Sequence, residues 1–335
     1  MNPKESLQDI IHQNDLITQA LSQYLNLHPR FITPEMVEDL ARECGLNTEE
    51  SFLVLFSAAC GLDTANERTH RALERDYLRT GVKHRDPNLY RADEYYRTVR
   101  LSHTQSGRWQ LCEMSYAPFE PFVCGHPILC PSFREIPQIG YFTEEFRFPA
   151  VLENGVEWMT VTPNEIETMK QPIENSHGRV LTLGLGLGYF AFCASQKSDV
   201  QSVTVIERDS DVISLFREQI LPQFPNADKI QILRADAIDY MEQLQADSFD
   251  YCFADLWHDA SDGLDVYIRL KRIERKRGLQ NIDYWIEPSL LSYLRRMVYE
   301  KLTDPTAPLR LQNMQIEEIL SDNFLRSLAS DMHRM

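Results

Sequence analysis

From residue 178 onward, short apolar segments rich in β-branched residues alternate with stretches long enough to form a helix. Four of these segments read RVLTLGL, SVTVIE, KIQILRA and FDYCFAD, and a fifth is expected at residues 283–286. Strands that alternate with helices form a parallel sheet with helices on both faces. The pattern therefore predicts an α/β fold with a doubly wound, Rossmann-like sheet in this half of the chain.

The first hundred residues carry helix caps and stops at helix-length intervals. Thr33 before Pro34 predicts one helix start, and Asn47 with Glu50 three residues later predicts another. We expect helices at about residues 5–27, 34–44, 48–60 and 64–80.

Two β-hairpins are expected between the helical region and the alternating half. One turns at Ser106 and Gly107, and the other turns at Asn154 and Gly155, a pair that supplies the two positive-φ residues of a tight turn. Residues 117–137 receive no assignment. We therefore predict a helical N-terminal domain at residues 1–95, a β-hairpin or lid segment at 96–168, and a Rossmann-like domain at 169–335.

The composition disfavours several classes of partner. The chain has 50 acidic and 34 basic side chains, a formal charge of −16, and a strongly acidic surface repels phosphate backbones and anionic lipids. No apolar run approaches the roughly 20 residues that span a bilayer, and the first residues, MNPKESLQDII, lack the apolar core of a signal peptide. We expect a cytoplasmic protein without a membrane partner.

Neither cysteines nor local basic runs alter this expectation. Seven cysteines without a CxxC pair indicate buried free thiols rather than disulfides or a zinc ribbon. The run RLKRIERKR and the basic residues between positions 64 and 100, where three helices before a hairpin allow a winged-helix-like unit, leave nucleic acid open as a partner. Such runs are more often solvated helix faces, so we consider a nucleic-acid partner unlikely.

A glycine-rich turn follows the first strand of the alternating half. Gly184, Gly186 and Gly188 lie between a strand and a helix, where glycine allows the backbone to approach a bound nucleoside. Tyr189 stands where a dinucleotide-binding turn needs its third glycine. The spacing therefore favours a thioether or sulfonium nucleoside over a dinucleotide.

Acidic residues end the next three strands. Glu207 is placed to bind ribose hydroxyls, Asp236 to accept a hydrogen bond from the amine of an adenine ring, and Asp255 to face the ligand crevice.

With these features the segments VLTLGLGLGYFAF, VTVIERD, LRADAIDY and FDYCFADLW resemble the motifs of class I S-adenosylmethionine-dependent methyltransferases. The resemblance implies that S-adenosylmethionine is the cofactor and that the three glycines line its methionine part. By the same resemblance Glu207 holds the ribose, Asp236 and the Ala237 amide read the adenine, and Asp255 faces the methyl donor and the substrate.

The segment VLENGVEWMTVTPNEIETM before the glycine turn is similar in layout to the spermidine synthase family. The chain departs from that family's motifs: Leu187 stands in place of an Asp in the turn, and Thr168 with Met169 replaces a Tyr-His pair. Aminopropyl transfer is therefore kept as an alternative.

The acceptor chemistry is expected in ADLWHDASDGLD, just beyond the fourth strand. His258 is our candidate general base, with Asp255 or Asp259 orienting it or holding an acceptor amine. The run also resembles a metal-binding segment of catechol-type O-methyltransferases, but only Glu287 follows the fifth strand where further ligands are expected, and we assign no metal. Four apolar side chains are candidates for a pocket wall, with core packing the simpler explanation for each: Trp158, Met159, Trp257 and Tyr189.

The sequence thus predicts an S-adenosylmethionine-dependent methyltransferase that acts on a small molecule. An aminopropyltransferase and a nucleoside-binding protein without turnover are the alternatives. The helical region is a candidate homodimer interface. We expect a helix at residues 288–302, then a strand at 308–316 and a helix at 317–335, so that the sheet is either shortened or completed by another element, such as one from a partner subunit.

Overall fold

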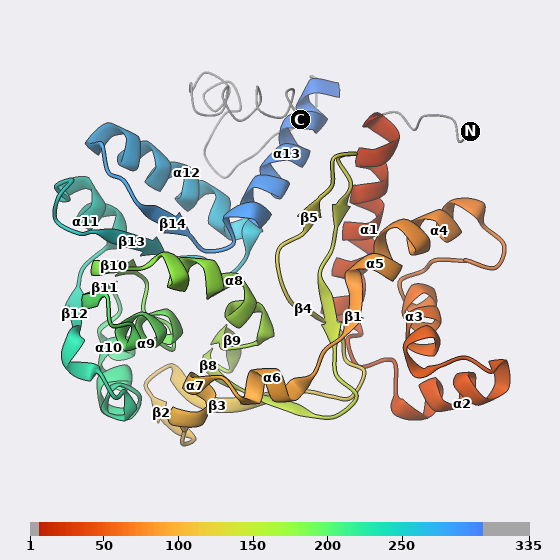
Figure 1. The fold of residues 1–335 in the computed structure, drawn as a ribbon, viewed down its shortest axis with the longest axis horizontal. Helices are drawn as coiled ribbons and strands as arrows, with labels where there is room; N and C mark the ends of the chain where they lie inside the picture. The colour runs from red at the N-terminus through yellow and green to blue at the C-terminus, as the bar shows by residue number, and fades with distance from the viewer. Residues whose placement is uncertain (1–6, 304–335) are drawn as a thin grey trace.

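A computed structural model describes residues 7–303, and the side chains of residues 8–298. Figure 1 shows a helical region at one end of the molecule and a mixed α/β region at the other, with small sheets between them. The strand and the helix expected at residues 308–335 lie outside the described residues.

Capping residues define the first helices. Thr33 accepts a hydrogen bond from the Met36 amide, and Asn47 and Glu50 form the reciprocal capping box. The predicted helices near the N-terminus are confirmed, and they are α1 (Leu7–Leu27), α2 (Pro34–Cys44) and α3 (Thr48–Ala59).

The prediction of one regular helix at residues 64–80 is wrong in two respects: the helix begins later, and a π-helical turn interrupts it. Asp63 accepts a hydrogen bond from the Asn66 amide at 3.0 Å and turns the chain, so the helix begins only at Arg68. It runs as α4 (Arg68–Leu73), a π-helical turn η1 (Glu74–Leu78) and α5 (Arg79–Gly81).

Both predicted hairpins are present in one antiparallel sheet of order β2-β3-β8-β9. Gly107, Asn154 and Gly155 have positive φ angles, as the turns require. The strands are β2 (Thr104–Ser106), β3 (Trp109–Tyr116), β8 (Phe146–Glu153) and β9 (Val156–Thr160).

Short elements fill the rest of this middle region, including the stretch that the sequence left unassigned. One sheet has the order β1-β7-β4 and another pairs β5 with β6. The elements are β1 (Val82–His84), α6 (Pro87–Arg91), α7 (Glu94–Thr98), β4 (Phe122–Val123), β5 (Ile128–Leu129), β6 (Glu135–Ile136) and β7 (Ile139–Tyr141).

The C-terminal half contains the predicted doubly wound sheet. Its five strands are parallel and have the order β12-β11-β10-β13-β14. After β10, the chain adds β11 and β12 on one side of it and then β13 and β14 on the other side. The strands are β10 (Gly178–Leu183), β11 (Val200–Glu207), β12 (Ile230–Arg234), β13 (Tyr251–Ala254) and β14 (Ile282–Tyr284). The α/β fold class is confirmed, and a ligand crevice is expected beyond the carboxyl ends of β10, β11 and β13.

Helices precede and follow these strands. The helix predicted at residues 288–302 is present in α13. The helices are α8 (Pro163–Asn175), α9 (Tyr189–Gln196), α10 (Ser210–Gln219), η2 (Leu221–Gln223), η3 (Ala227–Lys229), α11 (Ala237–Gln243), α12 (Ala260–Arg277) and α13 (Glu287–Thr303).

Two buried hydrophobic clusters hold the molecule together. The smaller one joins the helical region to β7 through Phe52, Phe56 and Tyr141, and the rings of Phe52 and Tyr141 stack at 3.9 Å. The larger one contains the parallel sheet together with Trp109 and Phe146 of the hairpin sheet. The middle region thus packs against both ends of the chain, and the predicted division at residues 95 and 168 stays a prediction.

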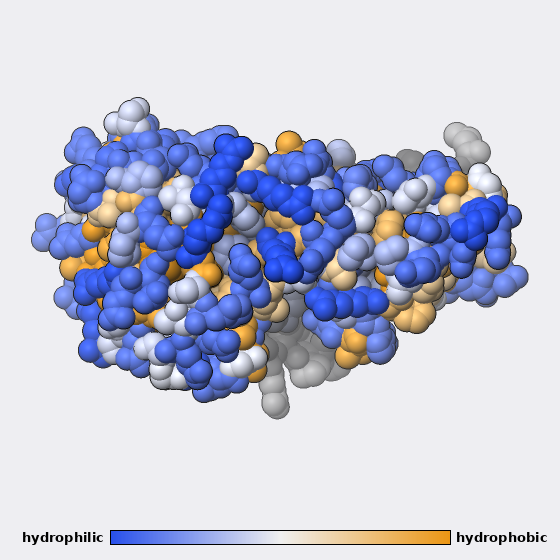
Figure 2. Space-filling view, turned by 90° about the horizontal axis from the view of Figure 1, so that it is seen from below, coloured by the Kyte–Doolittle hydropathy of each residue, from blue (hydrophilic) through white to orange (hydrophobic). Residues whose placement is uncertain are grey.

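On the face shown in Figure 2, hydrophilic side chains dominate and hydrophobic ones form small scattered groups. Among residues 7–303, no helix is long and apolar enough to cross a membrane. All seven cysteines are free thiols, but the prediction that they are buried holds only for Cys112, Cys124 and Cys252, and Cys44 is exposed.

Candidate functional site

Steric crowding explains the glycines of the turn between β10 and α9. Gly184 and Gly186 have φ angles of +98° and +50°. A Cβ at Gly184 would lie 1.9 Å from the Asp255 carbonyl oxygen, and one at Gly186 would lie 1.8 Å from Met159 Sδ. Since side chains are excluded here, the turn leaves bare backbone at the crevice.

A cavity of about 790 Å³ lies beside this turn. Most of the residues that the sequence singles out line it, namely Gly184, Gly186, Glu207, Asp236, Ala237, Asp255 and His258. Gly188 and Asp259 are not among the lining residues. Gly188 begins α9, and a Cβ there would lie 2.5 Å from the Phe216 ring, so this glycine serves close packing of the helix.

The two acidic residues expected at the nucleoside lie at the ends of neighbouring strands. Glu207 ends β11 and accepts a hydrogen bond through Oε1 from the Asp209 amide at 2.8 Å. Asp236 caps α11 through Oδ1, which accepts hydrogen bonds from the Ile238 and Asp239 amides at 2.9 and 3.1 Å. Each carboxylate is thus oriented through one oxygen, which leaves the other free to face the cavity.

Asp255 follows β13 and lies deeper in the cavity. Burial raises the pKa of its carboxyl group to about 8, and the nearby Glu165 carboxyl adds to this rise. Within the described chain its carboxyl group makes no hydrogen bond to a protein group. An acid with such a pKa and no protein partner is suited to exchange a proton, and a cation that binds beside it favours its ionised form.

Glu165 is a second buried acid in the same space, and the sequence reasoning missed it. It belongs to the capping box of α8, where it accepts hydrogen bonds from the Thr162 amide at 2.7 Å and from the Thr162 hydroxyl. Burial raises its pKa to about 7. The capping signature Thr-Pro-Asn-Glu was readable in the sequence, but it gave no sign that the carboxyl faces a cavity.

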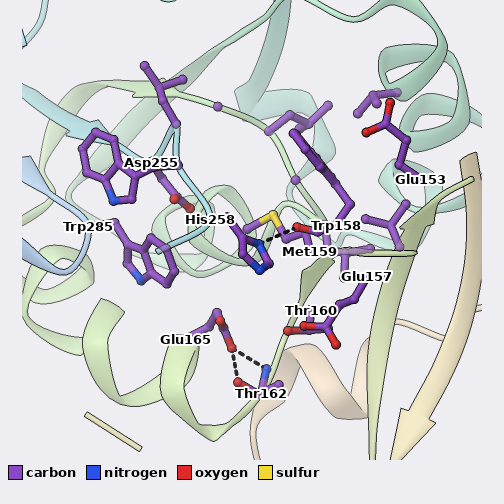
Figure 3. Close-up of a pocket in the computed structure, with 18 of the residues that line it drawn as sticks. Glu153, Glu157, Trp158, Met159, Thr160, Thr162, Glu165, Asp255, His258 and Trp285 are labelled. Atoms are coloured by element: carbon purple, nitrogen blue, oxygen red, sulfur yellow. Dashed lines mark hydrogen bonds between the residues drawn. The ribbon is translucent and has the colours of Figure 1, made fainter. Parts of the chain in front are cut away.

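Figure 3 shows Asp255, Glu165, His258 and Trp285 around a common space, with Glu157 nearby on β9. Burial raises the pKa of Glu157 as well, although His258 opposes the rise. Three carboxyl groups from β9, α8 and the end of β13 therefore line one cavity. We call Glu157, Glu165 and Asp255 the acid cluster.

His258 lies at the edge of this cluster. Its Nδ1 is 3.2 Å from the Trp158 carbonyl oxygen. A carbonyl oxygen only accepts, so this contact assigns the hydrogen of the neutral ring to Nδ1 and leaves Nε2 as the basic nitrogen.

Asp259, the other predicted catalytic acid, caps α12. Its Oδ1 accepts hydrogen bonds from the Ser261 amide and the Ser261 hydroxyl, both at 2.6 Å. Burial opposes ionisation of Asp259, but these hydrogen bonds outweigh it and lower the pKa. In the described structure this carboxylate orients the start of a helix rather than His258.

Aromatic side chains cover the acid cluster. Trp285 donates from Nε1 to the Thr168 hydroxyl at 3.0 Å, and Trp257 packs against Gly263, where a Cβ would lie 2.5 Å from the indole. Trp158, Met159 and Trp257 line the cavity. Tyr189 does not line the cavity: it is buried in the core, the simpler explanation, and its hydroxyl donates to Asp93 at 2.9 Å.

Within residues 7–303, no three His, Cys, Asp or Glu side chains are arranged so that together they could hold a metal ion, and this includes the acid cluster. Glu287 accepts a hydrogen bond from the Tyr267 hydroxyl at 2.6 Å and is not a lining residue of the cavity.

No family model matches the chain, and no curated protein matches it. Solved structures that align with it include the spermidine synthase from Thermotoga maritima, at 14% identity, 46% of this chain, 59% of that chain and a TM-score of 0.33. A spermidine synthase in complex with the transition state analogue AdoDATO aligns at 17% identity over 40% of this chain and 51% of that chain, with a TM-score of 0.32.

A probable spermidine synthase from Corynebacterium glutamicum aligns at 20% identity over 40% of this chain and 53% of that chain, with a TM-score of 0.30. The alignments thus cover less than two thirds of each of these three chains.

Proposed function

We propose that this protein transfers a methyl group from S-adenosylmethionine to the nitrogen of a small-molecule amine. The observation that carries the proposal is the acid cluster, which faces the same cavity as the bare backbone of the glycine turn. Carboxyl groups beside tryptophan faces recognise an ammonium group by charge and by cation–π attraction.

The residues around the turn fit an S-adenosyl nucleoside. Gly184 and Gly186 leave room for it, and Glu207 and Asp236 each keep one carboxylate oxygen available for a ribose hydroxyl or an adenine amine. S-adenosylmethionine, when bound, supplies a methyl carbon that its sulfonium activates.

The acid cluster would bind and deprotonate the acceptor. An ammonium nitrogen has no free electron pair, so it must lose a proton before it accepts a methyl group. With a pKa of about 8, Asp255 ionises at mildly alkaline pH, and its carboxylate then takes up such a proton; His258 Nε2 is a second acceptor at the rim.

Aminopropyl transfer remains a second candidate because of one feature of the cavity lining. Among the described lining residues the only Lys or Arg side chains are Arg108 and Arg208. Arg108 pairs with Glu153 at 2.8 Å and with Asp209, near the end of β11. Arg208 directly follows β11, so neither arginine belongs to the acid cluster, and a decarboxylated donor would need no basic partner there.

Calorimetric titration with four nucleosides under one condition tests these alternatives. We expect binding of S-adenosylmethionine and S-adenosylhomocysteine in preference to decarboxylated S-adenosylmethionine and NAD. Preference for the decarboxylated donor would favour aminopropyl transfer. Failure of all four to bind would refute the nucleoside site, whereas binding without turnover on any amine would favour a non-catalytic nucleoside-binding protein.

We further propose that nucleic acid and membranes are not partners, that the helical region forms a homodimer interface, and that the protein is cytoplasmic. The basic run on α12 is partly paired within the chain, which supports the first of these. Lys271 pairs with Glu274 at 2.8 Å, and Arg277 donates to the Leu244 carbonyl oxygen.

A further inference from the structure

The cavity extends beyond the acid cluster to the helical region. Its far lining comes from the end of α1, the loop that follows α1, and β4 with the residue before it. We call this lining the outer wall, and it consists of Leu25, Asn26, Pro29, Pro121, Phe122 and Val123. No residue of the outer wall carries a charge.

Tyr116 connects the two parts of the cavity. Its ring stacks on Phe122 of the outer wall at a centroid distance of 4.5 Å. Burial raises the pKa of its hydroxyl, and Glu165 and Glu157 of the acid cluster lie near enough to add to this rise. The acid cluster and the outer wall therefore adjoin one another across a single side chain.

The one carboxyl group beside the outer wall is already paired. Glu120 accepts hydrogen bonds from Arg30 Nε at 2.8 Å and from the Ala117 amide at 2.7 Å, both through Oε2. Arg30 is fixed in turn by a 2.8 Å hydrogen bond to the Ser115 carbonyl oxygen. A second ammonium group in this part of the cavity would compete with an existing ion pair, whereas a hydrocarbon chain would lose contact with water.

We propose that the acceptor is an amine with one charged end and a hydrophobic tail, which rests on the function proposed above. The ammonium group lies at the acid cluster and the tail lies along the outer wall. Val123 is 44% exposed, so the outer wall continues to the surface and a long tail has an exit. This assignment distinguishes an alkyl amine from a diamine or polyamine with charges at both ends.

Calorimetry with three amines of simple structure tests this assignment on the full chain saturated with S-adenosylhomocysteine. We expect n-octylamine to bind at least about tenfold more tightly than n-butylamine, because each added methylene group is removed from water. We also expect n-octylamine to bind at least about tenfold more tightly than 1,8-diaminooctane, whose second ammonium group meets no free carboxylate.

Two aspartate variants provide a matched pair. Val123→Asp should lower the affinity for n-octylamine by about tenfold and raise the affinity for 1,8-diaminooctane, since it places a free carboxylate on the outer wall. Leu27→Asp is the control, because Leu27 is 61% exposed and does not line the cavity. It should leave both affinities unchanged.

Each failure has its own meaning. Equal binding of n-octylamine and n-butylamine, tighter binding of the diamine, or no binding of any amine would overturn the hydrophobic-tail assignment while S-adenosylhomocysteine still binds. Failure of S-adenosylhomocysteine itself to bind would instead refute the proposed function.

Discussion

The two sides of the cavity are built in different ways. The nucleoside side consists of residues at the ends of successive parallel strands, so the topology of the sheet brings Gly184, Glu207 and Asp236 together. The acceptor side takes Glu157 from a hairpin, Glu165 from a helix cap and its outer wall from the helical region. Fold class therefore determines the first side, whereas the packing of distant segments determines the second.

The largest expected effect is a loss of nucleoside binding, caused by a change on the nucleoside side alone. Gly186→Arg should abolish binding of S-adenosylmethionine and S-adenosylhomocysteine, because even its Cβ would lie 1.8 Å from Met159 Sδ and the rest of the side chain would fill the cavity. Calorimetry measures the affinity, and circular dichroism checks that the variant folds.

Gly45→Ala is the control for backbone strain. Gly45 has a φ of +67°, but a Cβ there meets nothing within 4 Å, so only the strain, about 1 kcal/mol, is introduced. Normal nucleoside affinity in a folded Gly186→Arg variant would contradict the site.

Asp255→Asn should separate the two sides. We expect turnover at pH 8 to fall by about 100-fold or more, since an amide cannot ionise and so neither attracts an ammonium group nor takes its proton. Affinity for S-adenosylhomocysteine should change less than about threefold. Formation of S-adenosylhomocysteine from S-adenosylmethionine, with n-octylamine as acceptor, measures turnover, and an undiminished rate would exclude Asp255 from the reaction.

His258→Ala is expected to have a smaller effect, a loss of turnover of about 10- to 100-fold with nucleoside binding retained. His258 lies at the rim and offers only Nε2, because Nδ1 faces the Trp158 carbonyl oxygen. The same assay, run from pH 6 to 9, measures the change. A fully active variant would leave Asp255 as the sole proton acceptor.

The contrast between the two sides also explains what the sequence predicts. Alternating strands and helices, the glycine turn and the acidic strand ends are local patterns, so the fold and the placement of Glu207 and Asp236 follow from them. Glu165 carries only a helix-capping pattern, and the same pattern occurs at Glu50, which is exposed. Only tertiary packing distinguishes a capping acid in a cavity from one at the surface.

Glu165→Gln should change how the stability of the protein depends on pH, which tests the burial of this acid on the acceptor side. Glu165 and Asp255 have folded-state pKa values of about 7 and about 8, well above the ordinary 4.5 and 3.8. Folding favours their protonated forms, so their stabilising contribution is complete below pH 4 and is lost as the pH rises to about 8. In the Glu165→Gln variant, the fall in the free energy of unfolding over this pH range should be smaller by about 1–3 kcal/mol.

Thermal unfolding at pH 5 and pH 8 measures the difference for the wild type and the variant. Gln retains an oxygen that can accept the Thr162 hydrogen bonds, so the cap is preserved. Glu174→Gln, an exposed acid on the same helix, is the control and should leave the pH dependence unchanged. An identical pH dependence in the wild type and Glu165→Gln would contradict the burial of this acid.

Asp259→Ala should have the smallest effect and tests the boundary of the acceptor side. The variant removes the side-chain cap of α12 and should cost about 1 kcal/mol of unfolding free energy, with turnover unchanged. Asp259→Ser should restore the stability, because serine also caps helices. If instead both variants lost turnover as severely as Asp255→Asn, Asp259 would belong to the reacting groups, and the acceptor side would extend along the start of α12.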